Sequence, residues 1–130
     1  MVPTVSERFF RNWVRRYSRL MRWVDVVASE ELLPGQILTF EREEGDIVLW
    51  RTSTGDAVAC DSRCPHQWAH LGTAGAVDGD EIVCLSHFWR FDQDGVGSKL
   101  SATGRRDEKS PIDMFATREV DGRIELALPD

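Results

Sequence analysis

Cysteine and histidine are scarce in this chain, which has three of each among its 130 residues. No run of apolar residues approaches the roughly 20 that a helix needs to cross a bilayer. Residues 1–22 also lack the short apolar core of a secretory signal. The charged and apolar fractions, 29% and 42%, are ordinary for a soluble protein and exclude disordered and collagen-like classes. We therefore expect one domain, long enough for a core and located in the cytoplasm.

The charge is unevenly distributed along the chain. Residues 1–22 carry six Arg and one Glu, a net charge of +5, whereas residues 23–130 carry a net charge of −11. An acidic body with a basic arm suggests an encounter with a protein partner that is guided by charge. The only Arg-rich patch lies away from the candidate site described below, so nucleic acid is not an expected partner.

Residues 1–22 form a segment with a helical pattern that runs on to Val24. Apolar residues recur at helical spacing on one face and arginines on another. Thr4, with Glu7 three residues later, is a plausible capping box. We expect an amphipathic α-helix whose apolar face packs on this domain or on a second copy. Binding to a partner protein and contact with a membrane surface are the alternatives.

Residues 23–130 favour an all-β domain, because short apolar segments alternate with Gly-rich turns. Asp121-Gly122 is the strongest hairpin signal in the chain. The polar segment 97–112 is expected to form an exposed, mobile loop. The predicted strands are Trp23–Ala28, Gln36–Glu41, Asp46–Arg51, Ala57–Asp61, Glu81–Leu85, Met114–Val120 and Arg123–Leu128.

Two short boxes hold the most informative chemistry. The first reads Cys64-Pro65-His66, and the second, seventeen residues later, reads Cys84-Leu85-Ser86-His87. Each box offers one thiolate and one imidazole. A thiolate pair suits a soft ferric ion, whereas a neutral imidazole pair leaves its iron less negatively charged and easier to reduce.

With their flanking residues, Cys64-Pro-His66-Gln-Trp-Ala-His-Leu-Gly72 and Cys84-Leu-Ser-His87-Phe-Trp-Arg-Phe91-Asp-Gln-Asp-Gly95 resemble the two boxes of Rieske [2Fe–2S] domains. In such domains two His replace two Cys on one iron. The boxes are most similar to those of aromatic-ring and steroid oxygenase systems. The resemblance covers about residues 23–128 and implies stacked antiparallel sheets with a two-loop cluster-binding subdomain.

The resemblance also implies a ligand set. Cys64 and Cys84 would bind the inner iron, and His66 and His87 would bind the outer iron near the surface. A Cys₂His₂ zinc site uses the same residue types, but it normally has its Cys pair in one box and its His pair in the other. Cys60 then has no cysteine partner, so we expect it to be a buried strand residue in a protein of a reducing compartment.

Residues around the boxes bear on the reduction potential. Respiratory Rieske proteins join the two loops by a disulfide and place Ser and Tyr hydroxyls after the second ligand His. In this sequence Ala69 and Ser86 stand at the disulfide positions, and Trp89 and Phe91 stand at the hydroxyl positions. The resemblance therefore implies fewer hydrogen bonds to cluster sulfur and a low potential for a Rieske centre.

Trp68 and Phe88 flank the ligands and are predicted either to form an apolar docking rim around His66 and His87 or to pack between the loops. His70 is expected to be a loop residue with local hydrogen bonds. A mononuclear iron oxygenase centre needs two His and a carboxylate. With two of the three His on a cluster, this chain is not expected to build that centre.

We therefore expect a carrier of single electrons between a reductase and a terminal oxygenase, with oligomer formation left open. The first alternative is a Rieske domain of, or related to, an oxygenase large subunit that acts with a separate catalytic chain. The second is a structural or regulatory module in which a metal holds two loops together.

Overall fold

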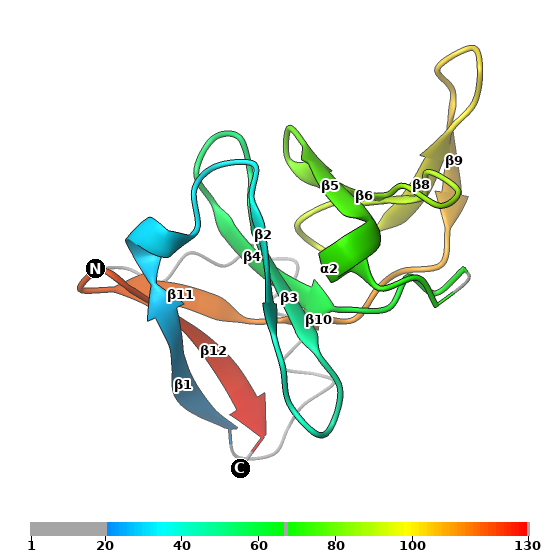
Figure 1. The fold of residues 1–130 in the computed structure, drawn as a ribbon. Helices are drawn as coiled ribbons and strands as arrows, with labels where there is room; N and C mark the ends of the chain where they lie inside the picture. Colours follow the sequence, from blue (N-terminus) through cyan, green and yellow to red (C-terminus); the bar gives the residue numbers. More distant parts are fainter. Residues whose placement is uncertain (1–20, 67, 130) are drawn as a thin grey trace.

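The computed structural model describes residues 21–66 and 68–129, which fold into three antiparallel sheets (Figure 1). The first sheet has the order β1 (Met21–Ala28), β12 (Arg123–Pro129), β11 (Thr117–Val120). The second has the order β10 (Met114–Phe115), β4 (Ala57–Asp61), β3 (Ile47–Arg51), β2 (Ile37–Phe40). The third has the order β5 (Gly75–Asp78), β6 (Glu81–Cys84), β7 (Arg90–Phe91), β8 (Gly97–Leu100), β9 (Arg106–Lys109).

Helix is sparse in the described residues, and the all-β prediction is confirmed. The described helices are a 3₁₀ turn, η1 (Ser29–Glu31), and a single turn, α2 (Leu71–Ala74). None of them is long and apolar enough to span a membrane. The predicted amphipathic helix lies outside the described residues except for its end. There Met21 and Arg22 begin β1 instead, because they pair with Pro129 and Leu128.

The second sheet forms the middle layer of the fold. Strand β3 is buried along its whole length, and successive residues of a strand point to opposite faces. Ile47 and Leu49 pack with the first sheet in one core cluster, together with Ile124 and Leu126. Val48, Trp50, Val58 and Cys60 belong to the other cluster, which also contains Cys64, Cys84 and Phe91. The predicted burial of Cys60 beside Val58 is confirmed.

In the sequence, the strands of the third sheet lie between β4 and β10, which are paired neighbours in the second sheet. The chain leaves the second sheet after β4 and returns to it at β10, where Met114 is paired with Cys60. Residues 62–113 between these points carry all of β5–β9 and both boxes. Figure 1 shows this part of the chain beside β3 and β4, away from β1 and β12.

A buried arginine holds the first two sheets together. Arg51 at the end of β3 donates from Nε to the carbonyl of Leu32 at 2.5 Å and from Nη1 to Glu119 at 2.8 Å. Glu119 belongs to β11 in the first sheet. The hydrogen bond from Arg51 lowers the pKa of the Glu119 carboxyl below its usual value, against the opposing effect of burial.

The turn chemistry of the last hairpin is as expected. Asp121 and Gly122 both have positive φ, 51° and 76°, between the paired residues Val120 and Arg123. Positive φ at both central residues defines the type I′ turn, which matches the twist of the flanking strands. The predicted hairpin at Asp121-Gly122 is thus confirmed.

The expectation of an exposed loop over residues 97–112 is wrong for much of its length. Strands β8 and β9 pair there, from Gly97 with Lys109 to Leu100 with Arg106. Gly97 permits the close approach, because a Cβ at this position would lie 2.2 Å from the carbonyl oxygen of Ser110. The hairpin has few apolar residues, which is why the sequence pattern did not reveal it.

Candidate metal centre

The first box lies in the loop between β4 and α2. Cys64 is 1% exposed, and its backbone is fixed at both ends. Its N–H donates to the carbonyl of Ala69 at 3.0 Å, and its carbonyl accepts from the N–H of Trp68 at 2.8 Å. Trp68 has a φ of 60°. These two bonds close the loop around His66.

The second box, between β6 and β7, has the same local geometry. The N–H of Cys84 donates to the carbonyl of Trp89 at 2.8 Å, and its carbonyl accepts from the N–H of Phe88 at 2.7 Å. Phe88 has a φ of 63°. The two loops therefore present a buried cysteine and an exposed histidine in matching frames, although the spacing from Cys to His differs by one residue.

The structure brings the four predicted ligand residues into one region, with sulfur inside and nitrogen outside. Cys64 and Cys84 are each 1% exposed and share a core cluster. The exposed rings of His66 and His87 lie with their centroids 4.9 Å apart and their planes at 83°. Imidazoles bound to one metal ion have ring nitrogens roughly 2 Å from it, so rings that share an ion must lie this near each other.

The donor set fits an asymmetric diiron cluster. A Rieske cluster needs two ligands on each iron, and the two thiols and two imidazoles supply these pairs. In residues 21–66 and 68–129 no group of three or more His, Cys, Asp or Glu side chains is arranged to hold a single ion. The same residue types also make up mononuclear Cys₂His₂ zinc sites.

Further backbone contacts hold the two loops to the sheets. The N–H of Leu85 in the second loop donates to the carbonyl of Ala74 at 2.7 Å, at the end of α2. The N–H of Leu71 donates to the carbonyl of Ser62 at 2.7 Å, and Arg63 forms a β-bridge with His70. Helix α2 thus connects the first loop with the second.

His70 has a structural role at the start of α2, which confirms the prediction of local hydrogen bonds. Its Nδ1 accepts the N–H of Gly72 at 2.9 Å. The proton is therefore on Nε2, which donates to the carboxylate of Asp46 at 3.0 Å. This hydrogen bond lowers the pKa of Asp46. Gly72 leaves room for the His70 ring, since a Cβ there would lie 2.7 Å from Cε1 of His70.

Apolar side chains are exposed beside the histidines. Trp68 is 68% exposed and Phe88 is 58% exposed, and Leu85 is a third exposed side chain that sequence reasoning missed. Trp68 also forms one wall of a cavity of about 180 Å³, whose lining includes Arg63, Pro65 and Ile112. We call Trp68, Leu85 and Phe88 the apolar rim. Exposed large apolar side chains grouped on a surface commonly mark sites of association.

A second aromatic contact was not anticipated from the sequence. The indole of Trp89 stacks on the imidazole of His66, with centroids 4.6 Å apart and planes at 5°. Lys109 on β9 places its Nζ 5.8 Å from the centre of the indole. No local sequence signal indicates this stack, because Trp89 and His66 lie in different loops.

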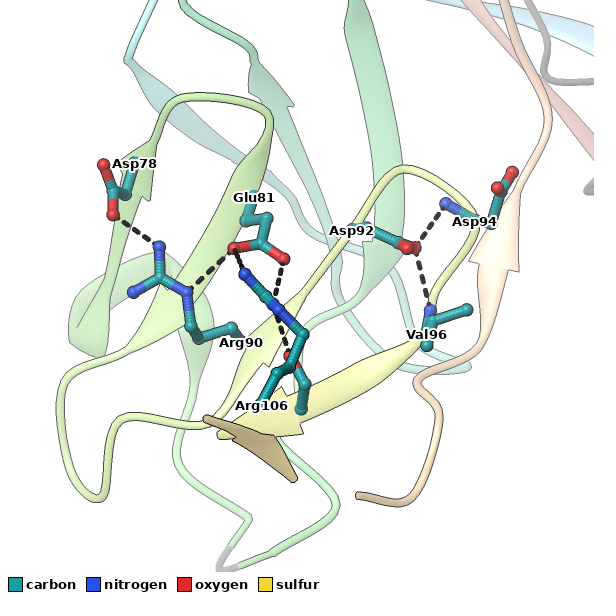
Figure 2. A network of polar contacts seen from close by, with 8 residues as sticks. Asp78, Glu81, Arg90, Asp92, Asp94, Val96 and Arg106 are labelled. Atoms are coloured by element: carbon teal, nitrogen blue, oxygen red, sulfur yellow. Dashed lines mark hydrogen bonds and ion pairs between the residues drawn. The ribbon is translucent and has the colours of Figure 1, made fainter. Parts of the chain in front are cut away.

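An ion-pair network fixes the strand that follows Trp89. Figure 2 shows Arg90 of β7 between Asp78 of β5 and Glu81 of β6, with Arg106 of β9 on the other side of Glu81. Arg90 donates from Nε to Glu81 at 2.8 Å and from Nη2 to Asp78. Burial alone would raise the pKa of Glu81, but the hydrogen bonds from Arg90 and Arg106 lower it overall. The network therefore joins four strands of the third sheet.

A carboxylate also shapes the turn after β7. One oxygen of Asp92 accepts the N–H groups of Asp94 at 2.9 Å and of Val96 at 3.0 Å, as Figure 2 shows. An Asp side chain that caps a turn in this way replaces missing backbone partners. The turn leads the chain from the second box into β8.

Comparisons with known proteins agree with this chemistry. The model of the Rieske [2Fe-2S] domain family matches residues 22–116. Cholesterol 7-desaturase nvd of Bombyx mori is 30% identical over 102 residues, which are 78% of this chain and 22% of that protein. The ferredoxin component of the p-cumate 2,3-dioxygenase system of Pseudomonas putida is 33% identical over 69 residues, 53% of this chain and 58% of that protein. The chain thus spans only part of each relative.

The fold is similar to solved structures as well. A chain from the complex of reduced oxygenase and oxidized ferredoxin in carbazole 1,9a-dioxygenase superposes with a TM-score of 0.67 at 24% identity, over 83% of this chain and 94% of that chain. Dicamba monooxygenase gives a TM-score of 0.69 at 24% identity, over 81% of this chain and 33% of that chain. At this level of identity the likeness establishes the fold alone.

Proposed function

Because the chain belongs to the Rieske [2Fe–2S] domain family and holds a Rieske-type cluster, we propose that Cys64, His66, Cys84 and His87 are its ligands and that the protein carries single electrons. The observation that carries the assignment is the difference in burial between the two kinds of ligand. Both cysteines are buried, whereas the two imidazoles are exposed and 4.9 Å apart. Such a cluster, when bound, accepts and releases one electron.

The chain's own residues set how that electron is exchanged. The buried cysteines exclude water from the inner side, and the exposed imidazoles of His66 and His87 are the groups that a partner reaches first. The apolar rim lies beside them and offers surface to desolvate on contact. Trp is enriched among the residues that dominate binding energy at interfaces, so Trp68 is the main candidate for docking.

We assign the protein to the transfer of electrons from a reductase to a terminal oxygenase, in the cytoplasm. Similarity to the ferredoxin component of the p-cumate 2,3-dioxygenase system supports the carrier role. The net charge of −11 over residues 23–130 supports charge-guided encounter with basic partner surfaces.

A second candidate is a Rieske domain of an oxygenase large subunit that acts with a separate catalytic chain. It is favoured by similarity to cholesterol 7-desaturase, of which the matched region is 22%. Besides the proposed ligands the sequence offers only His70, which is engaged with Asp46 and Gly72. Residues 1–130 therefore lack the two His of a mononuclear iron centre. Reduction by a purified reductase, followed by transfer to an oxygenase, separates the carrier from this candidate.

The composition of the purified protein tests the cluster ligands. Protein prepared without oxygen should contain iron and acid-labile sulfide in equal amounts and show the visible and electron-spin-resonance spectra of a Rieske centre. Cys84→Ser and His87→Ala should lose them. Cys60→Ser and His70→Asn are matched controls that should keep them. Colourless protein with one zinc and no sulfide would instead support the structural module.

The reduction potential tests the proposed oxygenase type. Half-buried Trp89 and fully buried Phe91 stand where respiratory Rieske proteins have Ser and Tyr. Neither side chain can donate an O–H to a cluster sulfur. Fewer such bonds leave the reduced cluster less stabilised. We expect a potential near the lower end of the roughly −150 to +300 mV span. A titrated value above about +200 mV, near the top of that span, would contradict this.

A further inference from the structure

Trp89 joins the two loops of the candidate centre through both its side chain and its backbone. Its carbonyl accepts the N–H of Cys84 at 2.8 Å, so the residue closes the second loop. Its indole reaches the first loop and lies parallel to the imidazole of His66, with centroids 4.6 Å apart and planes at 5°. A residue of one box thus fixes the ring that the other box supplies.

The position of the indole is itself determined by several contacts. Trp89 is half-buried and packs against the core cluster that includes Cys64 and Cys84. The next residue, Arg90, is anchored by Glu81 and Asp78, which belong to the hairpin of β5 and β6 (Figure 2). The indole is therefore packed against the core beside the imidazole and does not stand free on the surface.

The imidazole of His66 is constrained from two directions. Trp89 covers one face, and the ring of His87 lies nearly perpendicular to it at 4.9 Å. Parallel aromatic rings at this separation attract each other, and rotation of His66 would break the contact. Groups around metal ligands that orient the ligand rings increase metal affinity, because less freedom is lost when the metal binds.

We propose that Trp89 is a positioning residue that holds the imidazole of His66 in its iron-binding orientation and thereby couples the two loops. The proposal rests on the assignment of His66 as a ligand in the proposed function. This role is separate from the effect on the reduction potential, which arises because Trp89 lacks a hydroxyl group. His87 has no comparable parallel ring among the described contacts.

Substitutions at Trp89 test this role through the stability and spectrum of the centre. Trp89→Leu removes the ring, whereas Trp89→Phe keeps one. We expect Trp89→Leu to release iron to a ferrous chelator roughly tenfold faster than wild type, in the range typical of lost partners of metal ligands. It should also shift the g-values of the reduced protein. Trp89→Phe should restore both properties toward wild type, which a loss of bulk alone would not explain.

A matched control is Trp23→Leu, which removes an exposed tryptophan of β1 that packs under Arg118. This variant should release iron at the wild-type rate. Trp89→Met, with a flexible apolar side chain and no ring, repeats the test if Trp89→Leu does not fold.

Nuclear magnetic resonance of iron-free protein gives a second readout. The ring protons of His66 should resonate upfield, because the parallel indole lies over them, and Trp89→Leu should remove this shift. A wild-type iron-release rate, spectrum and His66 shift in Trp89→Leu would overturn the proposal while the cluster assignment stands. Wild-type protein without iron and labile sulfide would overturn the proposed function instead.

Discussion

Trp68 and Phe88 adopt the same left-handed backbone conformation at equivalent points of the two loops, with φ of 60° and 63°. Each donates its N–H to the carbonyl of the cysteine four residues before it. Bulky residues rarely adopt this conformation, which costs on the order of 1–3 kcal/mol and persists only where the surroundings enforce it. Both side chains are more than half exposed, so two of the three residues of the apolar rim have a strained backbone.

Removal of the rim should slow exchange with partners without a change in the centre. Trp68→Ala is expected to weaken docking of the reductase or oxygenase roughly tenfold, in line with about 1–2 kcal/mol for a tryptophan at an interface. The visible spectrum and potential should stay at wild-type values. Stopped-flow reduction at varied partner concentration measures the effect, with Trp23→Ala as the tryptophan control outside the rim. Equal rates in Trp68→Ala and wild type would place docking on another surface.

The Arg51–Glu119 pair should contribute to stability above acidic pH. Glu119→Gln is expected to lower the free energy of unfolding by about 1–3 kcal/mol, because buried Arg51 loses its charged acceptor. The control Glu44→Gln removes a surface pair with Arg42 and should change stability by less than about 1 kcal/mol. Urea denaturation at neutral pH compares these variants.

The same pair predicts a pH dependence. The pKa of Glu119 is lower in the folded state, so its contribution is fully present above the unfolded value of about 4.3. It is lost as the pH falls through the folded pKa. The difference between wild type and Glu119→Gln should therefore shrink in denaturation at acidic pH. A difference that is constant with pH would show that the carboxylate charge is not the cause.

The network in Figure 2 should be most sensitive at Arg90. Arg90→Ala removes the bonds to Asp78 and Glu81 and is expected to cost about 1–3 kcal/mol, since the side chain of Arg90 is largely buried. Arg106→Ala removes a half-exposed partner of Glu81 and should cost less. Thermal unfolding of both variants and of the double mutant measures the coupling. A larger loss in Arg106→Ala would contradict this ranking.

Cys60 should be chemically inert in the folded protein. Complete burial raises the pKa of its thiol to about 12, and only the thiolate reacts. Iodoacetamide at mildly alkaline pH should leave Cys60 unmodified in native protein and label it after denaturation, as peptide mass spectrometry would show. Labelling of native protein would indicate that β4 opens on the time scale of the reaction.

The boxes and most strands could be predicted from the sequence because their signals are local. Mixed Cys and His spacing indicated the candidate ligand region, and alternation with Gly turns located β3, β4 and the hairpin at Asp121-Gly122. The hairpin of β8 and β9 was missed, because charged residues dominate it and cross-strand pairing stabilises it. Strand β5 was missed for a similar reason, since only Ala76 and Val77 are apolar within it.

The arrangement of side chains within the candidate site was harder to predict from the sequence. The stack of Trp89 on His66 and the bond from His70 to Asp46 join residues from separate segments, and no spacing rule indicates which segments meet. Trp68 and Phe88 also have an unusual backbone conformation, and no recognised turn motif in the sequence indicates it. Trp68 and Phe88 are both more than half exposed, and their role as a docking rim stays a prediction.

The pairing of Met114 with Cys60 has a consequence for protein engineering. Residues 62–113 start and finish on adjacent hydrogen-bonded strands, so their two ends have the separation found at the mouth of any antiparallel hairpin. An unrelated β-scaffold could accept this segment in place of a hairpin turn, provided that it offers an apolar face for the side of the cassette that packs on β3 and β4. The whole segment that carries both boxes could then be transferred with only two new peptide bonds, one at each end.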